Sequence, residues 1–108
     1  MGLIVVLAWV FTALLLILFL ACIAAGRGVI PRNHWFGIRL PPLKRSDAAW
    51  RAGHAAGVAP SAVVFVIALV CCFMGATAPI AFWGAIVAFV GGLAWVGSEA
   101  IRAANKQN

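Results

Sequence analysis

Three long runs without a charged side chain constrain this chain more than any other feature. They cover residues 3–25, 58–76 and 80–97. A helix needs about 20 apolar residues to cross a hydrocarbon core of about 30 Å, so the first run is long enough and the other two lie near the lower limit. The sequence therefore predicts an all-α integral membrane protein with three transmembrane helices over about these residues.

Composition argues against a soluble protein. The chain is 66% hydrophobic and 9% charged, with a mean hydropathy of +1.11, whereas a soluble domain is about half apolar and a quarter charged. A soluble core of 108 residues could not bury so much apolar surface. The first run is also atypical of a cleaved signal peptide, because it lacks a positive segment and its apolar stretch exceeds about 15 residues. We interpret residues 1–108 as a single membrane domain.

The basic residues predict an orientation. Six of the eight lysines and arginines lie in the loop 26–57, and the other two lie in the tail 98–108. The positive-inside rule places that loop and the C-terminus in the cytoplasm and the N-terminus outside. Because these cations flank membrane spans, we interpret the net charge of +6 as a topology signal that also contacts anionic lipid head groups. We do not expect direct nucleic-acid binding.

No catalytic or metal-binding pattern stands out. Asp47 and Glu99 are the only carboxylates, and nothing in the sequence brings them together. The three cysteines form no CxxC motif and no Cys/His spacing suited to zinc. We therefore predict no enzymatic activity, no cofactor and no metal. The spans also lack the ionisable residues that pumps and coupled transporters use. This absence does not exclude a homo-oligomeric channel.

Small residues recur every four positions at 53, 57 and 61, and again at 84, 88 and 92. Rows of this kind let two helix backbones approach closely. They predict close packing of the second and third spans against their neighbours.

The loop 26–57 carries its own structural signals. Gly26 is a typical end of the first helix, and the Pro41-Pro42 pair is expected to keep residues 29–45 in turn or extended conformation. Ser46 is a typical N-cap for a short amphipathic cytoplasmic helix that runs to about residue 56. Pro60 is expected to start the second span or to kink the helix that leads into it.

Within the loop, a set of unlike residues follows a recognisable order: Asn33, Trp35, Gly37, Arg39, Pro41, Asp47, Trp50 and His54. This order resembles the signature of SdpI-type bacterial immunity proteins, over about residues 31–57. The resemblance is to the motif-bearing C-terminal half of the best-known member, so the chain looks like a short member of the family.

The resemblance implies a protein of the bacterial plasma membrane. The best-known member protects its producer from a secreted, membrane-active peptide toxin, and it signals by holding a transcriptional repressor at the membrane. The expected partners are therefore a peptide toxin and a cytoplasmic repressor. The alternative from a different class is a structural accessory subunit of a larger bacterial membrane complex, either an enzyme or a transporter.

The motif residues also suggest physical roles. Gly37 suits a backbone angle that other residues avoid, and Asn33 suits the cap of a turn. Arg39 can donate to Asp47, to helix-end carbonyls or to a lipid phosphate.

Two further motif residues lie on the expected short helix. Asp47, Trp50 and His54 share one helical face. Trp50 is expected to anchor this helix at the membrane interface, and His54 either senses pH or forms a hydrogen bond within the loop.

Overall fold

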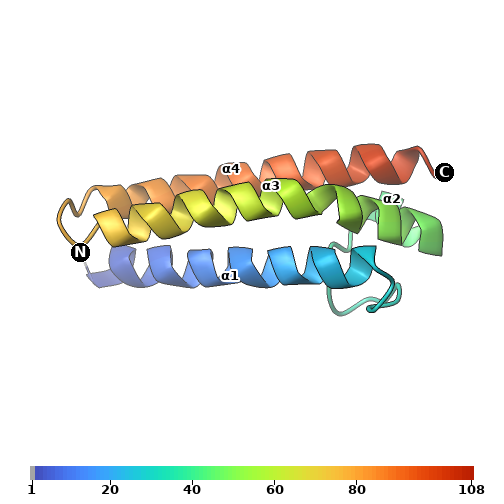
Figure 1. The fold of residues 1–108 in the computed structure, drawn as a ribbon, viewed down its shortest axis with the longest axis horizontal. Coiled ribbons are helices and arrows are strands. Elements are labelled where there is room, and N and C mark those ends of the chain that lie inside the picture. The colour runs from blue at the N-terminus through green and yellow to red at the C-terminus, as the bar shows by residue number, and fades with distance from the viewer. Residues whose placement is uncertain (1) are drawn as a thin grey trace.

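Three long helices lie side by side in an elongated bundle of 47 × 21 × 18 Å (Figure 1). The structure is a computed structural model that describes residues 2–108, and Met1 lies outside the described residues. The helices are α1 (Gly2–Gly26), α2 (Pro41–Lys44), α3 (Asp47–Met74) and α4 (Ala81–Asn105), and residues 2–108 contain no strand. The predicted all-helical architecture is confirmed, and all three long helices are long and apolar enough to cross a membrane.

Helix α3 forms the centre of the bundle because it packs against both α1 and α4. The predicted small-residue rows lie at these contacts. A Cβ added at Gly57 would lie 2.9 Å from Cys22 Sγ on α1, and one added at Gly92 would lie 2.8 Å from the Val64 side chain on α3. The glycines therefore set how closely the helices approach.

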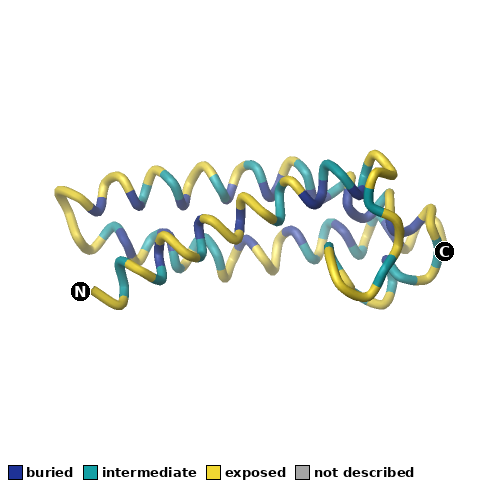
Figure 2. The backbone as a smooth tube through the Cα atoms, turned by 90° about the horizontal axis from the view of Figure 1, so that it is seen from below, coloured by how far each residue is buried: buried dark blue, intermediate teal, exposed yellow. Residues whose placement is uncertain are grey.

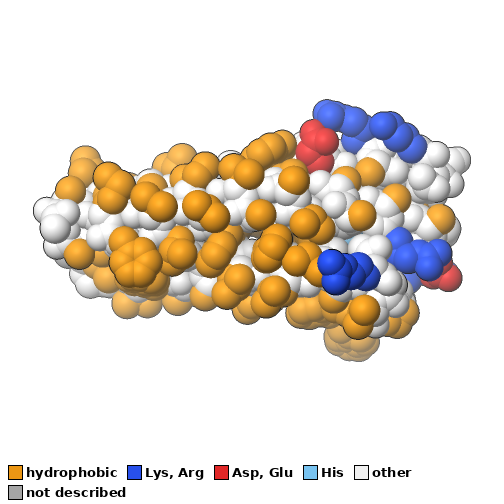
Figure 3. All heavy atoms as spheres, viewed as in Figure 1, with side chains coloured by type: hydrophobic (Ala, Val, Ile, Leu, Met, Phe, Trp, Pro, Cys, Tyr) orange, Lys and Arg blue, Asp and Glu red, His pale blue; other side chains and the backbone are white. Residues whose placement is uncertain are grey.

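The outside of the bundle is apolar. Figure 2 shows buried positions recurring along each long helix, with exposed positions between them. The exposed large hydrophobic side chains include Leu20, Val66 and Val87, one from each long helix. In Figure 3, hydrophobic side chains cover most of the bundle, whereas lysines and arginines gather at the end that holds α2 and the loop. We call this the basic end.

Two expectations about the loop need correction. Residues 47–56 are not a separate short helix, because they form the first turns of α3, which continues through Pro60 to Met74. The Pro41-Pro42 pair does not prevent helix either, because both prolines occupy the first positions of the one-turn helix α2. At those positions a missing N–H costs nothing, since the first turn of a helix has no acceptor for it.

The third long helix also extends further than its uncharged run. Helix α4 continues to Asn105, so most of the expected tail 98–108 is helical. Ala100 and Ala104 are fully buried at the basic end. These residues of the extension pack in one apolar cluster with Leu43 of α2 and Trp50 of α3.

Candidate functional site

The signature residues lie at the basic end. Residues 27–40, which we call the loop from here on, connect α1 to α2 and fold back over the first turns of α3. Asn33 shapes the start of this loop. Its Oδ1 accepts hydrogen bonds from the backbone N–H groups of Trp35 and Phe36, both at 2.7 Å, and its Nδ2 donates to the Pro31 carbonyl at 2.7 Å. Asn33 therefore caps a turn, in the manner expected of this residue type.

Gly37 lies where the loop passes closest to α3. Its φ angle is +99°, which is strained for any residue with a Cβ. An added Cβ would also lie 2.8 Å from His54 Nε2 and 3.1 Å from the Trp50 ring. Both the backbone angle and the close approach therefore require glycine at this position.

His54 joins the loop to α3 through both ring nitrogens. The Ile38 N–H donates to Nε2 at 2.7 Å, so Nε2 carries no proton. Nδ1 lies 2.7 Å from the Trp50 carbonyl and must therefore be the protonated nitrogen that donates to it. The ring is neutral, and a second proton would break the bond to Ile38. His54 precedes the uncharged part of α3, and burial lowers its pKa below the ordinary value of 6.5.

Trp50 lies beneath the loop rather than on the outer surface of the bundle. It is 1% exposed, its Nε1 donates to the Ile30 carbonyl at 2.9 Å, and its ring lies 4.3 Å from that of His54. Leu43 of α2 and Ile38 of the loop belong to the same apolar cluster. The expected anchoring role is therefore corrected: Trp50 holds the loop to the helix, because the loop supplies both apolar cover and a hydrogen-bond acceptor.

The two charged signature residues do not contact each other. Arg39 Nη1 donates to the His34 carbonyl at 3.1 Å, whereas Asp47 forms an exposed ion pair with Arg32, with Nε and Oδ1 3.5 Å apart. Arg32 also donates to the Lys44 carbonyl at 3.1 Å. Arg32 is therefore a structural residue that the sequence interpretation missed, and nothing in its spacing distinguishes it from Arg39.

The opposite side of the loop is open. Trp35 is 89% exposed, Val29 is 73% exposed and Phe36 is also exposed. Pro41, the remaining signature residue, is exposed at the start of α2. The signature thus has two parts: Gly37, Trp50 and His54 face inward and fix the loop, whereas Trp35 faces outward.

The site offers little to a metal ion. Within residues 2–108, no group of three histidine, cysteine or acidic side chains is close enough to hold one.

Comparison with known families gives this arrangement a context. The family model described as the SdpI/YfhL protein family matches residues 29–98. The chain belongs to the SdpI/YfhL protein family. The matched region contains most of the loop, α2, α3 and most of α4, so it joins the loop to the helices α3 and α4. Searches of curated proteins and of solved structures found no match.

Proposed function

We propose that this chain is an SdpI-like protein of the bacterial plasma membrane that protects the cell from a membrane-active peptide toxin. In this proposal the basic end faces the cytoplasm, and the loop is the recognition surface. Family membership supports the general class. The observation that supports a recognition role is the two-sided loop, in which the inward signature residues fix the backbone and leave Trp35 almost fully exposed.

A fixed loop is well suited to binding. Its hydrogen bonds with the side chains of Asn33, Trp50 and His54 order the backbone before any partner arrives, so less conformational entropy is lost in the complex. An exposed tryptophan is also the side chain that most often contributes large binding energy at interfaces. Trp35 is therefore our proposed contact for the toxin or for a cytoplasmic repressor that reports its presence.

Survival of a toxin-sensitive bacterium tests this proposal. Cells that express the chain are challenged with a panel of secreted, membrane-active bacterial peptides, with membrane levels checked by immunoblot. We expect protection against at least one peptide. Trp35→Ala should reduce that protection, because loss of a contact of about 1.4 kcal/mol weakens binding about tenfold. Val29→Ala, at a second exposed apolar loop position, should leave it unchanged.

Two results would contradict the proposal. One is the absence of protection against every peptide in the panel while the protein is present in the membrane. The other is purification in mild detergent as a stoichiometric part of a larger membrane enzyme or transporter, which would favour the accessory-subunit alternative.

A further inference from the structure

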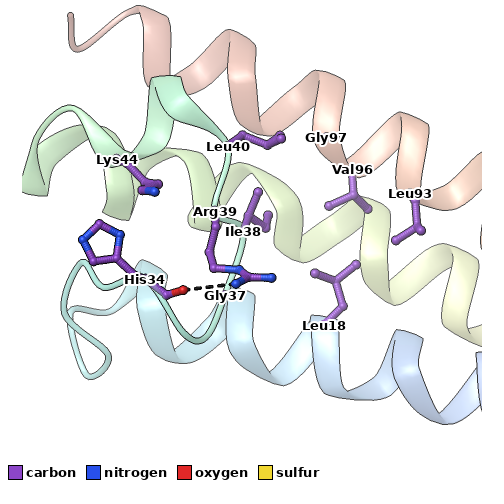
Figure 4. A pocket seen from close by; sticks show the side chains of 10 residues that line it. All are labelled: Leu18, His34, Gly37, Ile38, Arg39, Leu40, Lys44, Leu93, Val96 and Gly97. Atoms are coloured by element: carbon purple, nitrogen blue, oxygen red, sulfur yellow. Dashed lines mark hydrogen bonds between the residues drawn. The ribbon is translucent and has the colours of Figure 1, made fainter.

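A cavity of about 530 Å³ opens between α1 and α4 directly under the loop (Figure 4). Helix α1 contributes Leu18 and α4 contributes Leu93, Val96 and Gly97. Leu93 is 45% exposed, so the cavity reaches the apolar outer surface of the bundle. Its size falls within the usual range of about 300–1,000 Å³ for small-molecule sites.

The lining of the cavity changes character along the bundle axis. The part between the long helices is aliphatic and belongs to their uncharged stretches. The part under the loop carries Arg39 and Lys44. In Figure 4, the Arg39 side chain extends from the loop toward α1, with Leu18 and Leu93 on the side away from the loop. The cavity therefore joins an apolar groove to a cationic rim.

The two cations on this rim are available to an external anion. The only two acidic side chains of the chain, Asp47 and Glu99, pair with other arginines. Throughout residues 2–108, no ion pair involves Arg39 or Lys44. The one hydrogen bond of Arg39, to the His34 carbonyl, uses one of its five N–H donors.

We propose that this cavity binds one anionic phospholipid. The phosphate group lies at Arg39 and Lys44, and one acyl chain occupies the groove lined by Leu18, Leu93 and Val96. Guanidinium groups bind phosphate oxygens with paired, charge-assisted hydrogen bonds. The boundary between uncharged helix and basic loop is also the level at which a bilayer places its head groups.

Other occupants fit the cavity less well. A free phosphate would use the cationic rim and leave the aliphatic groove empty. A zwitterionic phospholipid would fill the groove, but its ammonium group would offset the attraction of its phosphate to Arg39 and Lys44. The charge complementarity of the site therefore favours a lipid whose head group carries a net negative charge. This inference is independent of any role in toxin immunity.

Native mass spectrometry of the full chain in mild detergent tests the proposal. The probes are phosphatidylglycerol, phosphatidylcholine with the same acyl chains, and sn-glycerol 3-phosphate, which has the anion but no acyl chain. We expect one molecule of phosphatidylglycerol to be retained, with clearly less phosphatidylcholine and no glycerol phosphate. Equal retention of the two lipids would overturn the role of the cations. Equal binding of glycerol phosphate would overturn the role of the groove.

Variants separate the site from general surface charge. Removing both rim cations, with Arg39→Gln and Lys44→Gln, should reduce bound phosphatidylglycerol about tenfold or more, since each basic residue near anionic head groups contributes about fivefold. The matched control removes two exposed cations of the basic end outside the cavity, with Arg27→Gln and Arg45→Gln. Neither side chain lines the cavity, and salt screens exposed charges that lie more than about 10 Å from the bound phosphate, so this pair should change binding less than about twofold. An equal loss in both pairs would show that surface charge alone retains the lipid.

A third variant tests the groove without changing any charge. A Cβ at Gly97 would lie 3.8 Å from the nearest Leu40 atom, so there is room for a side chain that projects toward the cavity. Gly97→Leu should fill the groove and reduce retention of phosphatidylglycerol, whereas Gly97→Ala should have little effect. Unchanged retention of phosphatidylglycerol in Gly97→Leu would contradict the proposal that an acyl chain occupies the groove.

Discussion

His54 shows how a single side chain can join two segments that are sixteen residues apart. The Ile38 amide reaches Nε2, and Nδ1 reaches the Trp50 carbonyl one turn earlier in the same helix. Both bonds require the neutral ring with its proton on Nδ1. Of the two roles that the sequence left open for His54, the structure shows the hydrogen bond within the loop.

The neutral ring makes the stability of the loop depend on pH. The pKa of His54 in the folded protein is lowered, chiefly by burial, from an ordinary value of 6.5. As the pH falls below about 6.5, His54 becomes protonated in the unfolded chain but stays neutral in the folded protein, so the free energy of unfolding falls as the pH decreases. We expect the thermal midpoint in detergent to be lower at pH 5 than at pH 8. In His54→Gln, which cannot titrate, this difference should shrink. An unchanged difference in the variant would assign the effect to other groups.

Gly37 and Gly28 allow backbone strain to be separated from steric overlap. Both have positive φ angles, +99° and +80°. A Cβ at Gly28 would meet only the flexible Arg51 side chain at 3.5 Å, whereas a Cβ at Gly37 would overlap buried His54. Gly28→Ala should cost about 1–2 kcal/mol from strain alone. Gly37→Ala should cost about 3 kcal/mol or more, because overpacking adds to that strain.

Hydrogen–deuterium exchange at the Ile38 amide, which donates to His54, measures the difference between the two variants. Gly37→Ala should expose the Ile38 amide to rapid exchange, whereas Gly28→Ala should leave it protected. Equal protection in the two variants would contradict the proposed close contact between the loop and α3.

Sequence reasoning recovered part of this site. The side-chain chemistry of Asn33 and the missing Cβ of Gly37 indicated their roles directly. Trp50 was misplaced because an indole in a basic loop suits either a membrane interface or a buried position. The choice depends on the Ile30 carbonyl and the Leu43 side chain that meet it. Those contacts depend on the path of the folded loop, so the spacing of residues in the sequence does not predict them.

At the scale of elements, α3 connects the site to the membrane-spanning part of the bundle. The same continuous helix holds Trp50 and His54 at the basic end and an uncharged stretch beyond them. The sequence indicated the N-cap correctly, and Ser46 Oγ accepts from the Ala49 N–H at 3.0 Å. Pro60 was expected either to start the second span or to kink the helix that leads into it. It lies buried inside α3, so the helix does not start there.

Two adjacent glycines in α4 test how closely that helix packs on α3. A Cβ at Gly92 would lie 2.8–3.0 Å from three atoms of Val64, whereas a Cβ at Gly91 would meet nothing within 4 Å. Gly92→Ala should therefore destabilise the bundle by about 1–3 kcal/mol. Gly91→Ala should be neutral, or more stable by up to about 1 kcal/mol, because alanine favours helix. Thermal unfolding of both variants in one detergent measures the difference. A more stable Gly92→Ala would contradict the close packing.

On the scale of the whole molecule, charge and hydropathy divide the bundle into two zones. One end carries the loop, α2 and the extended part of α4, and the rest presents apolar side chains outward (Figure 3). Uncharged runs predicted the three long helices because length and hydropathy alone decide whether a helix suits a bilayer. The sequence predicted helix after Ser46, but it did not predict that α4 continues to Asn105. That extension is stabilised by the packing of Ala100 and Ala104 at the basic end rather than by a long apolar run.

The proposed function places the basic end in the cytoplasm, and cysteine labelling tests this orientation directly. In a variant with all three native cysteines replaced by alanine, one cysteine is introduced either at Ala48, exposed at the basic end, or at Ala78, exposed in the turn between α3 and α4. A membrane-impermeant maleimide applied to intact cells should label Ala78→Cys and should reach Ala48→Cys only after the membrane is permeabilised. Labelling of Ala48→Cys in intact cells, with Ala78→Cys protected, would contradict the proposed orientation, and labelling of both would contradict a three-span membrane protein.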